Sequence, residues 1–143
     1  MFREKRRAQR VDIRFPVSVL LLDDKTGTVL AGPVEGVATN FSPMGIALAL
    51  ADIRLDRYHL FFTCQDHPSH IMQIGFTLPG ESGTVVNIPS QPVWYDLDRD
   101  ASENRVLLGL EFLLSPKNNN IKKLSQELFP GDRSPSSWWE KIF

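Results

Sequence analysis

The sequence predicts a mainly β protein of one domain: a small antiparallel β-barrel or sandwich of six to eight strands with one C-terminal α-helix. Three observations predict this class. The chain has 143 residues, of which 42% are hydrophobic and 23% charged, as in ordinary globular domains. Ten prolines and nine glycines indicate many turns. The apolar runs between those turns are short, which favours strands over long helices.

The first half of the chain predicts three strands and two turns. The runs that favour β-structure are rich in branched and apolar side chains, and they span Phe15–Leu22, Val34–Thr39 and Ile46–Leu50. The turn residues Asp23–Gly27 end the first run, and the segment Asn40–Gly45 separates the second run from the third.

The second half predicts five more strand candidates, in the order Tyr58–Thr63, Ile71–Leu78, Thr84–Ile88, Pro92–Leu97 and Val106–Leu113. We expect a polar loop over Cys64–His70, and we expect Pro89 to break one strand from the next because proline cannot donate to a ladder. The last run is apolar enough to be a central strand.

Only the end of the chain looks helical. Ser115 is a good N-cap, and Pro116 suits the first helical position. Ile121, Leu124 and Leu128 then form one helical stripe, which Pro130-Gly131 ends.

A Trp-rich tail follows the helix. Trp138, Trp139, Ile142 and Phe143 place four large apolar side chains in six residues, and such a cluster is either buried or adhesive. We expect the tail to fold back onto the barrel; the alternative is a short anchor for a partner protein. The predicted layout is therefore a flexible basic arm (1–14), a barrel (15–114), a helix (115–130) and this tail (131–143).

The charge of the chain is unevenly distributed. Residues 1–14 carry six cations and two anions, a net of +4, whereas the whole chain carries −1, so the remainder sums to −5. A basic arm on an acidic body suits an anionic partner, which leaves nucleic acid, a membrane surface and a phosphorylated small molecule open. A solvated terminus without a partner is the other interpretation.

Several function classes lack support in the sequence. No apolar run approaches the ~20 residues of a membrane span, and no signal-peptide core follows the basic terminus, so we expect a cytoplasmic protein. Cys64, His67 and His70 lie together, but a structural zinc site needs a fourth ligand, and we expect no metal or cofactor. Asp96, Asp98 and Asp100 lack the glycine and glutamate of a calcium loop. With no nucleophile elbow and no phosphate loop, we expect a protein that is not an enzyme.

Two short motifs remain. Arg6-Arg7-Ala8-Gln9-Arg10 runs directly into the first strand, and Asn40-Phe41-Ser42-Pro43-Met44-Gly45 forms a strand-to-strand turn. The second motif is also typical of an ordinary tight turn, in which Asn40 and Ser42 bond local backbone and Gly45 supplies a positive φ.

Together and in this order, the motifs resemble those of the PilZ family, whose members carry an RRxxR or RxxxR arm and a (D/N)xSxxG turn on a small β-barrel and bind cyclic di-GMP. The resemblance covers residues 3–129 and includes Pro92-Val93-Trp94 and Gly109-Leu110-Glu111-Phe112-Leu113. It implies a PilZ-like barrel and a ligand site made of Arg6, Arg7, Arg10, Asn40, Ser42 and Gly45.

The chemistry of these residues suits that ligand. Guanidinium groups can fork onto phosphate or onto guanine O6 and N7, and Asn40 can accept from a guanine edge. The resemblance implies a bacterial second-messenger receptor of motility or biofilm regulation that acts through an unidentified protein partner, with no nucleic acid and no membrane span. The alternatives are a PilZ-like interaction module that binds no nucleotide and, last, a single-strand nucleic-acid binder.

Overall fold

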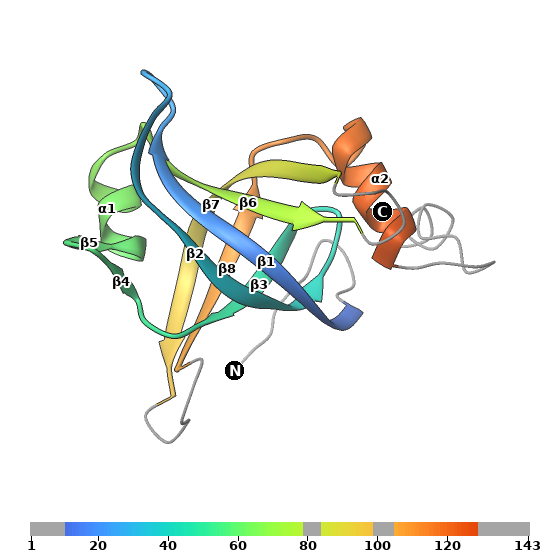
Figure 1. Ribbon diagram of the computed structural model, residues 1–143, viewed down its shortest axis with the longest axis horizontal. Helices are drawn as coiled ribbons and strands as arrows, with labels where there is room; N and C mark the ends of the chain where they lie inside the picture. Colours follow the sequence, from blue (N-terminus) through green and yellow to red (C-terminus); the bar gives the residue numbers. More distant parts are fainter. Residues whose placement is uncertain (1–10, 79–83, 99–104, 129–143) are drawn as a thin grey trace.

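The computed structural model describes residues 11–78, 84–98 and 105–128, and it confirms the predicted antiparallel barrel (Figure 1). Six strands close the barrel in the order β1-β2-β3-β8-β7-β6, with every neighbouring pair antiparallel. They span Val11–Asp23 (β1), Thr28–Phe41 (β2), Gly45–Leu50 (β3), His70–Thr77 (β6), Val85–Leu97 (β7) and Val106–Phe112 (β8).

Two further strands and two helices lie outside the barrel wall. Arg54–Leu55 (β4) and Tyr58–His59 (β5) form a short two-stranded sheet. The helix Leu60–Asp66 (α1) follows this sheet directly, whereas Asn119–Leu128 (α2) follows the last barrel strand. In Figure 1, α1 and α2 lie at opposite sides of the barrel.

The core fills the barrel because inward and outward residues alternate along each strand. Alternate positions of β3 and β8 are buried in one apolar cluster with residues of every other barrel strand. Phe41 and Phe112 meet there with ring centroids 5.9 Å apart. The helix α2 adds Ile121 and Leu124, both fully buried, so two residues of the predicted helical stripe belong to the core.

The predicted strand Tyr58–Thr63 and the loop after it are wrong over most of their length. Only Tyr58 and His59 are extended, and residues 60–66 form α1. The Nδ1 atom of His59 accepts a hydrogen bond from the Phe62 amide (3.2 Å) and caps the helix. A short aromatic run does not distinguish helix from strand by its pattern, and here the local cap and burial of Leu60 and Cys64 favour the helix.

The predicted break at Pro89 is also wrong, because β7 continues through it. Residues 85–90 pair with β6, and residues from Ser90 onward pair with β8, so the two ladders overlap at Ser90. The Pro89 carbonyl accepts from the Leu113 amide (2.9 Å). Since the N–H and C=O of one strand residue point to the same side, the missing N–H of Pro89 faces the end of the β7–β8 ladder and removes no bond to β6.

Two boundaries also differ from the sequence prediction. Residues 11–14 of the predicted arm belong to β1, while residues 1–10 and the tail lie outside the described residues. The helix begins at Asn119, and its N-cap is Asn118, whose Oδ1 accepts from the Asn120 amide (2.8 Å). Ser115 instead accepts from the Lys117 amide (3.1 Å) in the preceding turn. Neither α1 nor α2 is long and apolar enough to cross a membrane.

Candidate functional site

The candidate site is a row of residues on the outer wall of the barrel. Asn40 of β2 pairs with Ala47 of β3, Ala47 pairs with Gly109 of β8, and Gly109 pairs with Trp94 of β7. The core contains Phe41 after Asn40 and both chain neighbours of Ala47 and of Gly109, so alternation turns these three residues outward. Trp94 lies on the same side, because its indole covers Gly109. The register therefore aligns residues from four strands that are far apart in the sequence.

An irregularity in β2 puts Asn40 into this row. The register shifts between Ala38 and Asn40, which leaves Thr39 as an extra residue. Ala38 and Phe41 both remain fully buried on the inner side. The Thr39 hydroxyl donates to the Ala47 carbonyl, although at 3.4 Å the bond is long. This bulge lets Asn40 face outward while Phe41 enters the core.

The middle of the row is a floor of very small side chains, with Trp94 at its edge. A Cβ atom added to Gly109 would overlap the indole of Trp94, so the aromatic ring lies directly over the glycine. Ala47 is the next residue along the row. Ala47 is only 1% exposed and Gly109 is buried, so this part of the wall is already covered in the structure.

The turn after Asn40 is held by local hydrogen bonds. The Ser42 amide donates to the Gly45 carbonyl (3.0 Å), and the Ser42 hydroxyl accepts from the Met44 amide (3.2 Å). Ser42 is buried, with 6% of its surface exposed. The local-turn interpretation is thus correct for the Ser42 side chain, which braces the turn.

Gly45 is needed for a reason that the sequence did not indicate. Its φ is not positive, so the expectation of a left-handed glycine is wrong. A Cβ atom at this position would instead overlap the Leu110 carbonyl of β8. Because a backbone oxygen in a closed barrel cannot move aside cheaply, only glycine lets β3 and β8 approach here.

The register of β1 brings the two sequence motifs together. Val11 pairs with Phe41, and Asp12 pairs with Asn40. Arg10 is bonded to Val11, so the basic arm joins the barrel beside the residue that precedes Ser42. Arg6, Arg7 and Arg10 themselves lie outside the described residues.

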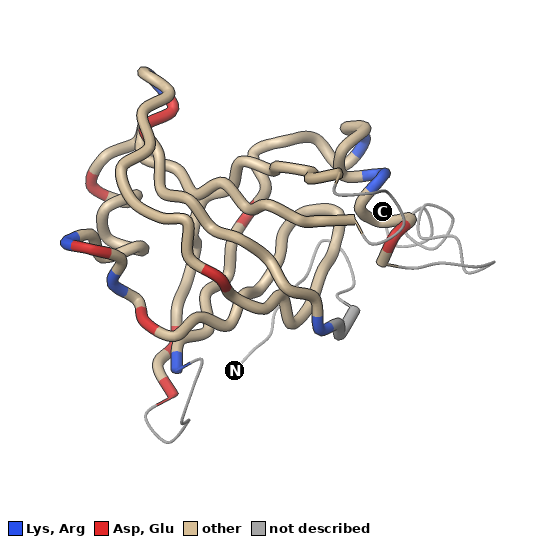
Figure 2. The backbone as a smooth tube through the Cα atoms, in the orientation of Figure 1, with Lys and Arg blue, Asp and Glu red and all other residues tan. Residues whose placement is uncertain are grey.

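The described part of this site has no cation of its own. Asn40 and Ser42 are neutral, and Glu111, which pairs with Gly45, is exposed and acidic. Figure 2 shows most charged residues at the loops and strand ends, while the strand walls are largely uncharged. Any positive charge for an anionic ligand at this row must therefore come from elsewhere in the chain. The basic arm continues directly into β1, whose first residues pair with Asn40 and Phe41.

The residues weighed for metal binding are placed differently. Cys64 is buried in α1, and burial raises the pKa of its thiol to about 12. The rings of His67 and His70 stack at 4.5 Å, and Nδ1 of His70 lies 3.0 Å from the Thr63 hydroxyl. Among the described residues, no three histidine, cysteine or acidic side chains form a group that could hold a metal ion.

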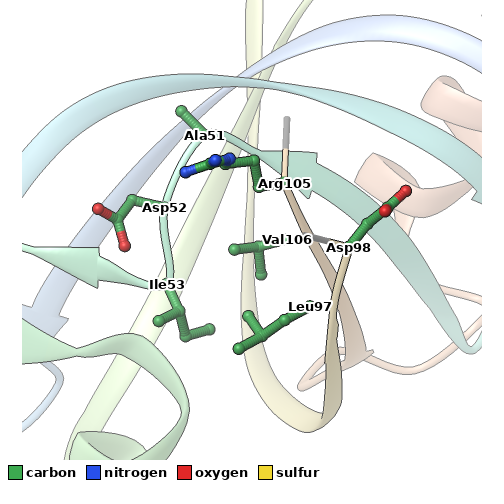
Figure 3. Close-up of a pocket in the computed structure, with 7 residues that line it drawn as sticks. All are labelled: Ala51, Asp52, Ile53, Leu97, Asp98, Arg105 and Val106. Atoms are coloured by element: carbon green, nitrogen blue, oxygen red, sulfur yellow. The ribbon is translucent and has the colours of Figure 1, made fainter. Parts of the chain in front are cut away.

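A separate open pocket of about 390 Å³ lies at the other end of β3 and β8 (Figure 3). Ile53, Leu97 and Val106 form its apolar floor, and the Arg105 guanidinium extends over it toward Ala51 and Asp52. The sequence analysis placed none of these residues in a site.

Trp94 and Gly109 belong to segments that support the family resemblance, but the sequence analysis assigned neither residue to the ligand site. A glycine in one strand and a tryptophan in its neighbour were the sequence feature that could have indicated their contact.

Comparison with known proteins gives matches in structure only: no family model and no curated protein matches the chain. The chain resembles the PilZ domain of CeSA from a cellulose-synthesizing bacterium, at 16% identity and a TM-score of 0.45, over 76% of this chain and 83% of that one.

Two longer proteins are also similar. One is the inhibitor of motility MotI/DgrA of Bacillus subtilis, at 13% identity and a TM-score of 0.49, over 97% of this chain and 50% of that one. The other is PlzA of Borreliella burgdorferi, solved in complex with c-di-GMP, at 14% identity and a TM-score of 0.48, over 79% of this chain and 46% of that one. The chain thus spans about half the length of these two proteins.

Proposed function

We propose that this protein is a non-catalytic receptor for cyclic di-GMP, which binds on the outer wall of the barrel between the basic arm and the row from Asn40 to Trp94. The single observation that carries the proposal is the register of β1 with β2. It joins the arm to the strand that bears Asn40, and the two motifs that resemble those of PilZ proteins thereby meet at one place.

The arm would supply the charged contacts to such a ligand, and the barrel wall would supply the neutral ones. Arg6, Arg7 and Arg10 supply planar cations for two phosphates and for guanine O6 and N7. The Asn40 amide offers an acceptor to guanine N1–H and N2–H. Ser42 is already engaged within its turn, so it holds Asn40 and the strand end in place.

Trp94 adds an aromatic edge to this site. Its indole is positioned over Gly109 rather than over a larger side chain, and it is partly exposed. Purine bases stack well on such rings and on guanidinium planes. A guanine at this site would stack on the exposed part of the Trp94 ring.

The arm is the part of the protein that would pass the signal on to a partner. Without an anion, Arg6, Arg7 and Arg10 repel one another, and a ligand with two phosphates removes that repulsion. We propose that the arm closes over the ligand and that the ordered arm presents a new surface to a protein partner. The chain carries no sequence motif for catalysis, so the response passes to that partner.

Isothermal titration calorimetry on the full chain tests the proposal. We expect saturable heat with cyclic di-GMP and none with GMP or a short single-stranded oligonucleotide at equal concentration. Binding of the oligonucleotide alone would favour a nucleic-acid binder. No binding of any of the three, with a folded protein by circular dichroism, would favour the alternative of an interaction module without nucleotide.

A further inference from the structure

All three histidines of the chain lie at the two ends of α1. His59 is the N-cap of this helix, and His67 is its C-cap. His70 is the first residue of β6, and its ring stacks on that of His67. Histidine is the side chain whose charge ordinarily changes between about pH 5 and 8. Both ends of α1 therefore depend on groups that can gain a proton in this range.

The N-terminal end of α1 is held by a neutral ring. The Phe62 amide donates a hydrogen bond to Nδ1 of His59 (3.2 Å), so this nitrogen carries no proton. In the imidazolium form both ring nitrogens are donors, and the Phe62 amide loses its acceptor. A cation at the first turn also opposes the dipole of the helix. Protonation of His59 thus removes a contact and adds a repulsion at the same place.

The surroundings of His59 favour its neutral form. Arg54 pairs with His59 across β4 and β5, and Tyr95 faces the ring from β7, with centroids 5.3 Å apart. Burial, and then the charge of Arg54, lower the pKa of His59 below the ordinary ~6.5 of an imidazole. The other charged residues of this segment are all exposed: Asp52, Asp56 and Arg57.

This direction fixes the sign of the pH dependence. As the pH falls, the unfolded chain takes up the proton at position 59 before the folded chain does. The contribution of the neutral cap to stability is therefore complete above the unfolded pKa, and it is lost as the pH falls through the folded pKa.

The C-terminal end of α1 tolerates a positive charge. Nδ1 of His67 lies 3.3 Å from the Thr63 carbonyl, to which it can only donate, so this contact survives protonation. A cation at the last turn of a helix is also favourable. The nearest charged residues along the chain and across the ladder are acidic, namely Asp66 beside His67 and Asp23, which pairs with His70. Acid therefore acts on the His59 end of the helix.

We propose that His59 is a pH-operated cap, which holds the first turn of α1 against β7 when the ring is neutral and releases that turn in acid. The side chains that move are Phe61 and Phe62. Their rings lie 5.2 and 6.0 Å from that of Tyr95, and the Phe62 ring lies 4.4 Å from that of His59. The aromatic surface that α1 forms with Tyr95 is present at neutral pH and is lost in acid. Figure 1 shows α1 directly beside β5, which ends in His59.

Leu60 limits the movement to the helix itself. Its side chain is buried, and its amide donates to the Ile53 carbonyl (2.9 Å), which does not titrate. The chain therefore stays attached to the barrel at this point when the cap opens. The Leu60 amide is an internal reference one residue away from the group that titrates.

Amide exchange followed by NMR on the full chain tests the proposal between about pH 7.5 and 5. We expect the protection factor of the Phe62 amide to fall at least tenfold, or about 1.4 kcal/mol, which lies within the ~0.5–2 kcal/mol of a lost N-cap. The fall should follow the titration of the His59 imidazole, observed in the same samples. Protection of the Leu60 amide should stay level.

Two variants assign the effect to one histidine. His59→Asn keeps a preferred N-cap oxygen without a titrating ring, so we expect the protection of the Phe62 amide to stay level. His67→Asn is the matched control at the other end of α1, and it should retain the loss seen in the wild type. Circular dichroism at neutral pH checks that both variants fold.

Three results would overturn the proposal. One is a Phe62 amide in the wild type whose protection stays level while His59 titrates. The second is an equal loss of protection in His59→Asn, and the third is the disappearance of the loss in His67→Asn. Each of these measurements is made without nucleotide, so the inference does not depend on the proposed ligand.

Discussion

The indole of Trp94 lies over the bare backbone of Gly109, its partner across β7 and β8. This contact connects the stability of the barrel wall with the shape of the candidate site. A side chain at position 109 would push the ring away from the row that begins at Asn40.

We expect Gly109→Ala to destabilise the protein by about 1–3 kcal/mol, because the added methyl group overlaps the Trp94 ring. The measurement is urea unfolding, together with the tryptophan emission of the folded state, which should shift as Trp94 moves. Gly75→Ala is the matched control on β6, since the nearest atom to its methyl group would be the Asn87 Oδ1 at 3.0 Å, the end of a flexible side chain. Equal losses in the two variants would contradict the close contact.

The second prediction concerns the arm. Arg6→Ala and Arg10→Ala should each weaken cyclic di-GMP binding at least tenfold, because one charge-assisted contact is worth about 1.5–3 kcal/mol and a factor of ten is about 1.4. Arg3→Ala, in the same arm but outside the motif, is the control. Calorimetry gives the affinities, and unchanged values for both motif variants would refute the site.

Substitutions in the barrel wall should have graded effects on the same affinity. Asn40→Ala removes a neutral contact, so we expect a smaller loss than for either arginine. Ser42→Ala should cost stability as well as affinity, because the Met44 amide loses its acceptor. Thermal melting recorded beside calorimetry separates the two. An Asn40→Ala loss larger than that of Arg10→Ala would contradict the assigned roles.

The fourth prediction is a change in protection of the arm. If the arm closes over the ligand, amide exchange in residues 3–14 should slow when cyclic di-GMP is added. Amides of β8 serve as the internal reference, since they belong to the closed barrel in either state. Equal protection of the arm with and without ligand would contradict ligand-dependent closure.

Cys64 gives a prediction about pH. Its pKa is raised to about 12 by burial, whereas an unfolded thiol titrates near ~8.5. The folded state therefore keeps the thiol neutral. The contribution of the neutral thiol to the free energy of unfolding is complete below the pKa of the unfolded state, and it is lost as the pH rises toward the pKa of the folded state. Relative to Cys64→Ala, the wild type should lose up to about 1.4 kcal/mol of unfolding free energy per pH unit above pH ~8.5. Unfolding at pH 8 and pH 10 measures this, and a constant difference would contradict a buried thiol.

Local patterns in the sequence determined most strands and the type of fold. The alternation of Ile46–Leu50, the apolar run of Val106–Leu113 and the turn residues between the strands each depend on near neighbours, so they can be read from the chain. The same holds for the stripe of Ile121 and Leu124, which the structure buries. The two motifs were likewise visible, because each is a short run of residue types with definite chemistry.

What the tertiary structure decided are the contacts between distant strands. Pro89 could continue a strand only because its missing N–H faces the end of the β7–β8 ladder, and Gly45 is required by the Leu110 carbonyl rather than by its own φ. The row of Asn40, Ala47, Gly109 and Trp94 depends on three strand registers and one bulge. A sequence pattern records which residues alternate along one strand, but the register between strands is fixed by how the whole barrel closes and fills its core.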